Sequence, residues 1–281
     1  MNHTINLSHR AQRPAGPIRA VILDWAGTAV DHGSIAPVMA FVEVFRLHGV
    51  EISVEEARGP MGLPKCDHIR AITQMPMVAA LWKAVHDRLP NEADVAAMYE
   101  AFIPLQLKVL ADYADPIPGT VETVARLRQR GIKIGSTTGY NRQMMEVLVP
   151  EAVRRDFQPD SIVCVSDVPA GRPEPWMALR SALELRAYPP ALCVKVGDTV
   201  PDIQEGLNAG MWTVAVALTG NELGLTAEEL AALSQDELET RRERAHLRLA
   251  DAGAHYVIDG IWSLPWVLDD IEARLADGEQ P

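Results

Sequence analysis

A single carboxylate follows the first apolar run of the chain. Val21, Ile22 and Leu23 lead directly to Asp24, and the chain then turns through small residues in "DWAGTAVD". A run this apolar is typical of a buried strand, which would leave Asp24 at the carboxyl end of that strand. An aspartate there can attack phosphorus and form an aspartyl phosphate. Enzymes that cleave phosphate esters in this way usually carry a second acid two residues later, and here that residue is Ala26.

Two further aspartates follow a later apolar run. The segment "VGDTVPD" supplies Asp198 at the end of a predicted strand and Asp202 one helical turn later. When a carboxylate attacks a phosphoryl group, the two negative charges repel each other. A Mg²⁺ ion held by carboxylates and carbonyls screens this repulsion. The alternative is that Asp198 caps the next helix and Asp202 is solvated. Together with Asp24, the pattern favours a metal site.

Two other segments could bind a phosphoryl group. In "STTGY" (136–140), hydroxyls and a glycine stand where a predicted strand leads into a helix, so Thr138 and backbone N–H groups could bind phosphate oxygens. In "PAGRPEPW" (169–176), Arg172 stands between Pro and Gly residues and could neutralise a transferring group. Ordinary helix capping and a surface turn are the alternatives for these two segments.

The elements that must position these residues alternate between strand and helix. Apolar runs predict strands at 19–24, 132–137, 161–166, 192–198, 212–217 and 255–259. Helical patterns cover 119–131, 141–153, 175–186 and 201–210. This alternation predicts an α/β fold with a parallel sheet covered on both faces. Ligands of such sheets bind beyond the carboxyl ends of the strands, where Asp24, Thr138 and Asp198 all fall.

A helical block interrupts the α/β pattern after the first strand. Helices are predicted at 36–49, 53–60, 65–73, 77–89 and 91–113. Inserted at this point, the block should form a cap domain over the carboxyl edge of the sheet. We therefore expect a flexible N-terminal extension (1–18), a core domain (19–33 and 115–281) and a helical cap domain (34–114).

The composition limits the possible partners and surroundings. With 281 residues and a net charge of -12, the chain is large enough for a core with an inserted domain and too acidic for general binding of nucleic acid or an anionic membrane. Its apolar runs are shorter than the ~18 residues of a membrane helix. Three cysteines without a CxxC spacing predict reduced thiols in a cytoplasmic protein.

The motifs, in this order, resemble the haloacid dehalogenase superfamily, whose core is a Rossmann-like parallel sheet. Within it, "DWAGTAVD", "ARGPMGLPKCDHIR", "GSTTGY", "DVPAGRPEPWM" and "KVGDTVPDIQEGLNAGMWTV" are similar to the phosphonoacetaldehyde hydrolase family. The resemblance implies hydrolysis of the carbon–phosphorus bond of phosphonoacetaldehyde to acetaldehyde and phosphate, in the degradation of 2-aminoethylphosphonate. It also implies a magnesium ion, a lysine Schiff base, an aspartyl-phosphate intermediate and a homodimer formed through the cap.

The resemblance assigns roles residue by residue. It implies that Asp24 is the nucleophile and that Lys65 forms the Schiff base. Magnesium ligands would be Asp24, the backbone carbonyl of Ala26 and Asp198, with Asp202 supporting them. The phosphonate and the surroundings of the lysine would be contacted by Thr138, Gly139, Arg172, Met61, His68 and Tyr140.

The chemistry connects Ala26 with Lys65. Simple cleavage of a carbon–phosphorus bond would release a carbanion, which a carboxylic acid protonates poorly. A protonated imine next to that bond accepts the electrons instead, so that a lysine is needed and a second acid is not. Lys65 follows the Gly/Pro turn of "GPMGLPK" and should begin a helix, whose positive end would lower the pKa of its amine.

Several alternatives stay open on the sequence alone. His68 could transfer protons during imine formation, or it could be a packed histidine. The base that activates water for hydrolysis of the aspartyl phosphate is either His68 or the amine of the leaving enamine. A magnesium-dependent phosphatase or phosphomutase of the same superfamily is the main alternative function, although Ala26 contradicts it. The others are a magnesium- or phosphate-binding domain that has lost activity and an interaction protein built on helices at 226–253.

Overall fold

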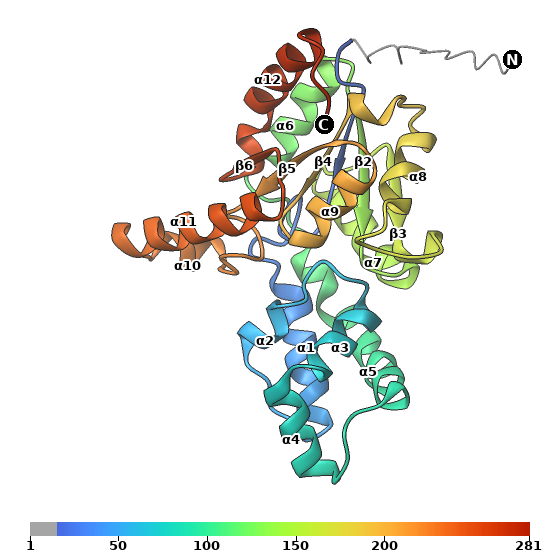
Figure 1. Ribbon diagram of the computed structural model, residues 1–281, viewed down its shortest axis with the longest axis vertical. Coiled ribbons are helices and arrows are strands. Elements are labelled where there is room, and N and C mark those ends of the chain that lie inside the picture. The colour runs from blue at the N-terminus through green and yellow to red at the C-terminus, as the bar shows by residue number, and fades with distance from the viewer. Residues whose placement is uncertain (1–15) are drawn as a thin grey trace, which may run out of the picture.

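The computed structural model describes residues 16–281, so most of the expected N-terminal extension (1–18) lies outside the described residues. At its centre is a parallel six-stranded sheet with the order β3-β2-β1-β4-β5-β6 (Figure 1). Its strands are Ala20–Leu23 (β1), Lys133–Thr138 (β2), Ser161–Cys164 (β3), Cys193–Gly197 (β4), Trp212–Val216 (β5) and Tyr256–Ile258 (β6). Each strand overlaps a predicted apolar run, although β2 extends one residue beyond its run to Thr138, and the arrangement confirms the predicted α/β class.

Helices cover both faces of this sheet. Ala20 and Ile22 of β1 pack in one apolar cluster with residues of α8, whereas Val21 and Leu23 belong to a second cluster with α6, α7 and α12. The two faces are separated because successive side chains of a strand point in opposite directions. The helices are Thr120–Gln129 (α6), Arg142–Arg154 (α7), Trp176–Glu184 (α8), Val200–Asn208 (α9) and Leu264–Ala276 (α12).

The strand order places the site at the middle of the sheet. β1 pairs with β2 on one side, with Leu23 opposite Ser136, and with β4 on the other, with Leu23 opposite Val196. The later strands lie on both sides of β1, with β2 and β3 on one side and β4 to β6 on the other, so that the residues after its carboxyl end stand at the switch point of the fold. Asp24 is the first of these residues.

The first five helices after β1 form a separate lobe beyond the carboxyl end of the sheet (Figure 1). They are Ile35–Leu47 (α1), Val54–Arg58 (α2), Lys65–Thr73 (α3), Pro76–His86 (α4) and Glu92–Leu110 (α5), followed by a 3-10 turn at Ala111–Tyr113. We call this lobe the cap and the rest of the described chain the core. Capping boxes begin α2 at Ser53 and α5 at Asn91. The rings of Phe41 and Phe102 stack with centroids 4.6 Å apart and join α1 to α5.

The predicted helical segment 226–253 consists of two helices, Ala227–Ala231 (α10) and Gln235–Asp251 (α11), which extend sideways from the core (Figure 1). Ala245 and Leu249 of α11 pack against Ile203 of α9 in a small apolar cluster of the core. None of the helices within residues 16–281 is long and apolar enough to cross a membrane.

Candidate active site

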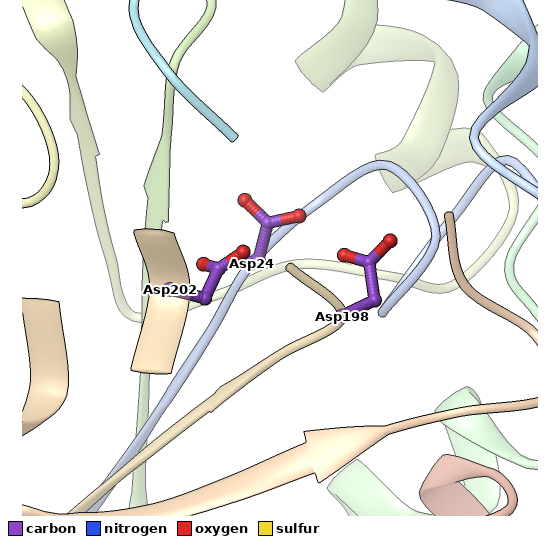
Figure 2. A group of neighbouring side chains, drawn as sticks. All are labelled: Asp24, Asp198 and Asp202. Carbon is purple, nitrogen blue, oxygen red and sulfur yellow. The ribbon is translucent and has the colours of Figure 1, made fainter. Parts of the chain in front are cut away.

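Asp24, Asp198 and Asp202 come together at the carboxyl edge of the sheet (Figure 2). A carboxylate oxygen from each lies within 4.8 Å of those from the other two, and all three residues are buried. Asp24 follows β1, Asp198 follows β4 and Asp202 is in the first turn of α9. The predicted convergence of Asp24, Asp198 and Asp202 is therefore present in the structure.

The turn after Asp24 brings the backbone close to Asp198. The backbone N–H of Asp24 donates to the Val196 carbonyl at 2.9 Å, which fixes the end of β1 beside β4. Gly27 has φ +86°, and a Cβ atom at this position would clash with the carboxylate of Asp198. Glycine is needed here both for its backbone conformation and for this close approach.

Asp198 is held by hydrogen bonds from two loops. Thr28 Oγ1 donates to Asp198 Oδ1 at 3.0 Å, and the backbone N–H of Asn221 donates to Asp198 Oδ2 at 2.8 Å. Burial raises the pKa of Asp198 well above its usual value, and the neighbouring acids raise it further. The alternative for Asp198 was that it caps the next helix. The residue at the cap position of α9 is Thr199, so Asp198 does not cap this helix.

Asp202 is fully buried and paired with two cations. Lys195 Nζ donates to Asp202 Oδ1 at 2.6 Å, Arg172 Nη2 lies 3.0 Å from the same oxygen, and Thr199 Oγ1 donates to Oδ2 at 2.5 Å. Burial alone would raise the pKa of Asp202, but Arg172 and Lys195 outweigh it and lower that pKa. This placement excludes the alternative of a solvated aspartate.

Arg172 is also buried, and hydrogen bonds to the core hold its guanidinium in place. Its Nε donates to Glu205 Oε2 at 2.9 Å, while Nη2 donates to Asp24 Oδ1 at 2.7 Å and to the Thr137 carbonyl at 3.1 Å. Nη1 makes no hydrogen bond to any residue in 16–281, and Arg172 lines the cavity above Asp24. The guanidinium can therefore offer Nη1 to an anion in that cavity.

The charges of this cluster suit a divalent cation. Four carboxylates (Asp24, Asp198, Asp202 and Glu205) surround two cations (Arg172 and Lys195), so that full ionisation leaves two negative charges uncompensated. Burial and the charge of Asp202 raise the pKa of Asp24 to about 6, as expected where negative charge is in excess. Carboxylate oxygens are hard ligands of the kind that Mg²⁺ takes. The residues present therefore fit a metal ion of this class.

Residues of the core and the cap together line the cavity above Asp24. The core supplies Asp24, Ala26, Thr138, Gly139, Tyr140 and Arg172, and the cap segment supplies Met61 and Lys65. Two close approaches join the lobes here: a Cβ atom at Gly62 would clash with Thr199 Oγ1, and one at Gly139 would lie 3.1 Å from the Leu63 carbonyl. The structure thus brings all these predicted residues to one cavity.

Lys65 is the first residue of α3, as predicted, and is only 7% exposed. Its Nζ lies 5.0 Å from the centroid of the Tyr140 ring and 5.4 Å from that of the Phe41 ring. Burial lowers the pKa of Lys65 to about 8; Arg172 lowers it further, while Asp24 opposes the shift. From the sequence we expected the positive end of the helix to lower the pKa of Lys65, whereas the main cause in the structure is burial.

His68 lies behind the cavity rather than in its lining. Its ring stacks on Phe41 with centroids 3.8 Å apart, and Nε2 lies 2.8 Å from the Ala57 carbonyl, so Nε2 carries the proton. Nδ1 has no hydrogen-bond partner in the described part of the chain. Burial and the nearby Lys65 charge lower the pKa of His68 well below its usual value, which keeps the ring neutral.

Two buried charged residues of this cluster were not singled out from the sequence. Lys195 stands inside the apolar run of β4, and Glu205 follows Asp202 by three residues on α9. A lysine in a buried strand must be paired, because an isolated buried charge is very costly. That signal could have identified Lys195, but its partners depend on how α9 packs against the sheet.

The chain is similar to known hydrolases over most of its length. Residues 18–210 match the family model of the haloacid dehalogenase-like hydrolases. A phosphonoacetaldehyde hydrolase from Syntrophobacter fumaroxidans is 51% identical over 95% of this chain and 96% of its own length. One from Bacillus cereus is 52% identical over 92% of this chain and 97% of its own.

A solved structure is similar over the same length. It is a phosphonoacetaldehyde hydrolase like protein from Oleispira antarctica, with a TM-score of 0.93, 46% sequence identity, and coverage of 95% of this chain and 97% of the other. The similarity to all three proteins includes both the cap and the core. The chain therefore belongs to the phosphonoacetaldehyde hydrolase family of the haloacid dehalogenase-like hydrolases.

Proposed function

We propose that this protein hydrolyses phosphonoacetaldehyde to acetaldehyde and phosphate, using Lys65 as the Schiff-base residue and Asp24 as the nucleophile. The observation that supports this most strongly is that Lys65 and Asp24 line the same cavity from opposite lobes. A pKa of about 8 gives Lys65 a usable fraction of neutral amine near neutral pH. Ala26 lines the cavity where an ester-cleaving relative would have an acid.

The first half of the proposed reaction takes place on the cap side. The neutral Nζ of Lys65 attacks the aldehyde carbon, and loss of one water gives an imine that carries a proton on nitrogen. The rings of Phe41 and Tyr140 contact this nitrogen through their faces and would tolerate either charge state of it. Thr138, Gly139 and Arg172 Nη1 would bind the phosphonate oxygens on the core side.

The second half takes place at Asp24. Its carboxylate oxygen attacks phosphorus, and the electrons of the breaking P–C bond pass to the protonated imine, which becomes an enamine. Protonation of the enamine carbon and addition of water then release acetaldehyde and restore Lys65. A second water hydrolyses the aspartyl phosphate, so that one water is consumed overall. The base for this last step is the lysine amine or His68. The Phe41 ring lies against both residues, with its centroid 3.8 Å from that of the His68 ring and 5.4 Å from Lys65 Nζ.

We propose Mg²⁺ as the metal, held by Asp24, the Ala26 carbonyl and Asp198, with Asp202 supporting the site through Lys195 and Arg172. When bound, it would screen the repulsion between the carboxylate and the phosphonate. Asp202 Oδ1 is paired with the cations Lys195 and Arg172, whereas Asp198 makes no ion pair with any residue in 16–281, which supports a role for Asp202 next to the metal rather than on it.

A test with two substrates separates this function from that of a phosphatase. With Mg²⁺ present, phosphate release should be rapid from phosphonoacetaldehyde and slow from a simple phosphate monoester, because Ala26 supplies no acid for an alkoxide. Rapid hydrolysis of the ester with no release from the phosphonate would replace this proposal with a phosphatase. Inertness toward both would favour a binding domain.

We also propose that the protein is a homodimer joined through α4 of the cap. Met77, Leu81 and Val85 form one exposed stripe along this helix, with exposed fractions of 67%, 42% and 54%. Exposed apolar stripes of this kind mark protein contacts. Sedimentation should show a dimer that Leu81→Glu converts to a monomer, whereas Leu183→Glu on the exposed side of α8 leaves it dimeric. A monomeric wild type would contradict the proposal.

The proposed location is the cytoplasm. Cys66, Cys164 and Cys193 are all free, and two of them are buried. Free thiols are the rule in a reducing compartment, which supports this expectation.

A further inference from the structure

Arg58, at the end of α2, joins the cap to two parts of the core. Its Nη1 donates to the Gly33 carbonyl at 2.8 Å and to Asn221 Oδ1 at 3.2 Å, and its Nη2 donates to the Gly224 carbonyl at 2.9 Å. Gly33 precedes the first cap helix, whereas Asn221 and Gly224 belong to the loop after β5. One side chain of the cap thus holds two segments in place: the segment through which the chain enters the cap, and the core loop after β5.

The same core loop holds a carboxylate of the proposed metal site. The backbone N–H of Asn221 donates to Asp198 Oδ2 at 2.8 Å. Arg58 is therefore two hydrogen bonds away from Asp198, through the side chain and the backbone of one residue. The orientation of Asp198 depends on a loop whose position depends on Arg58.

The fit around the guanidinium is tight. Gly224 has φ +62°, and a Cβ atom at this position would lie 2.5 Å from Arg58 Cζ. The loop can close on the arginine only because this residue is a glycine. Lysine could not replace the contacts, because one ammonium group cannot reach three acceptors that a planar guanidinium bridges.

On the cap side, Arg58 precedes the segment that reaches the cavity. Met61 and Lys65 follow it by three and seven residues, and Gly62 between them packs against Thr199 of the core. The contacts of Arg58 therefore fix the start of the segment that presents the reactive lysine.

We propose that Arg58 is a positioning residue that couples the seating of the Lys65 segment to the orientation of Asp198. The proposal rests on the proposed function for the role of Lys65. It requires that loss of Arg58 weakens two properties that belong to different lobes, namely imine formation on the cap and divalent-cation binding in the core.

The test measures both properties in the full-length protein. Mg²⁺ affinity is measured by calorimetry without substrate, and imine formation by borohydride reduction in the presence of phosphonoacetaldehyde. Arg58→Lys should weaken Mg²⁺ binding by about 10-fold, the low end of the range for residues behind a metal ligand, and should slow trapping on Lys65 by about 10-fold as well. Arg70→Lys is the matched control, because Arg70 binds Glu92 and Asp67 at the far end of α3.

Gly224→Ala is the second variant, because it displaces the guanidinium without changing Arg58. It should reproduce both losses in a protein that unfolds at nearly the wild-type temperature. Wild-type Mg²⁺ affinity in either folded variant would overturn the coupling, and so would weakened Mg²⁺ binding with normal trapping. Wild-type protein that binds Mg²⁺ but releases no phosphate from phosphonoacetaldehyde would instead contradict the proposed function alone.

Discussion

Arg172 and Lys65 are buried cations that line the same cavity, but their surroundings are opposite. Arg172 lies among carboxylates, three of them within 3.0 Å; these outweigh the effect of burial and raise its pKa well above the usual value. Lys65 lies against two aromatic rings and makes no ion pair with any residue in 16–281, so burial lowers its pKa to about 8. The core keeps a permanent charge for binding an anion, and the cap prepares an amine that can lose its proton.

This difference teaches how the proposed reaction divides between the lobes. A phosphonate needs fixed positive charge, which paired groups in a rigid core supply. An aldehyde needs a neutral nucleophile, which an unpaired and desolvated lysine supplies. Variants of the two lobes should therefore fail in different ways.

Lys65→Arg should lower the rate of phosphate release from phosphonoacetaldehyde by about 10⁴- to 10⁶-fold, as expected for loss of a nucleophile. A guanidinium keeps the positive charge but cannot form an imine. Mg²⁺ affinity should stay at the wild-type value, because Lys65 belongs to the cap. Lys108→Arg, at an exposed position of the same lobe, is the control and should retain full activity.

Asp198→Asn should have the reverse pattern. Calorimetry should show Mg²⁺ binding weakened by about 100-fold, because Asp198 is a proposed ligand and stands among the three converging aspartates. Trapping of the substrate on Lys65 should continue, since the cap segment is untouched. An equal loss of trapping would show that the two lobes do not act separately.

Glu205→Gln should disturb the core without removing a proposed ligand. Its Oε2 accepts from Arg172 Nε at 2.9 Å, so the loss of charge should loosen the guanidinium and lower kcat/KM by about 30-fold, less than removal of a donor would. Inhibition by inorganic phosphate should weaken in parallel. Glu272→Gln, which alters a carboxylate paired with Arg130 far from the cavity, should change neither quantity.

The pH dependence of trapping tests the cap alone. With a pKa of about 8, Lys65 is protonated at low pH, and the neutral amine grows as pH rises through that value. The trapping rate should therefore rise by about tenfold between pH 7 and pH 9 and level off above pH 9. A rise that continues to pH 10 or higher would indicate an ordinary solvated lysine and would contradict the proposed environment of Lys65.

Much of the fold and of the site follows from local sequence. Buried parallel strands are continuous apolar runs, so β1 to β6 were predictable from composition within short windows. It was predictable that Asp24, Thr138 and Asp198 lie close together, because the carboxyl ends of parallel strands share one edge of the sheet. The resemblance added Lys65, whose position at the start of α3 is confirmed.

Other features depend on contacts between distant segments. Lys65 lies between Phe41 and Tyr140, which are far apart in sequence, so the main cause of its lowered pKa was not predictable. The links from Arg58 to Asn221 and from Arg172 to Glu205 likewise depend on how loops and α9 pack. Helix ends also shifted: α4 ends at His86 rather than at residue 89, because Asp87 takes a left-handed conformation with φ 56°.

In the proposed reaction, Lys65 of the cap forms an imine with the same phosphonoacetaldehyde molecule that Asp24 of the core attacks. Incubation with phosphonoacetaldehyde and borohydride, followed by peptide mapping by mass spectrometry, tests it most directly. We expect one reduced adduct on the peptide that contains Lys65, together with loss of activity in proportion to labelling. An unmodified Lys65 in an enzyme that still releases phosphate from this substrate would contradict it.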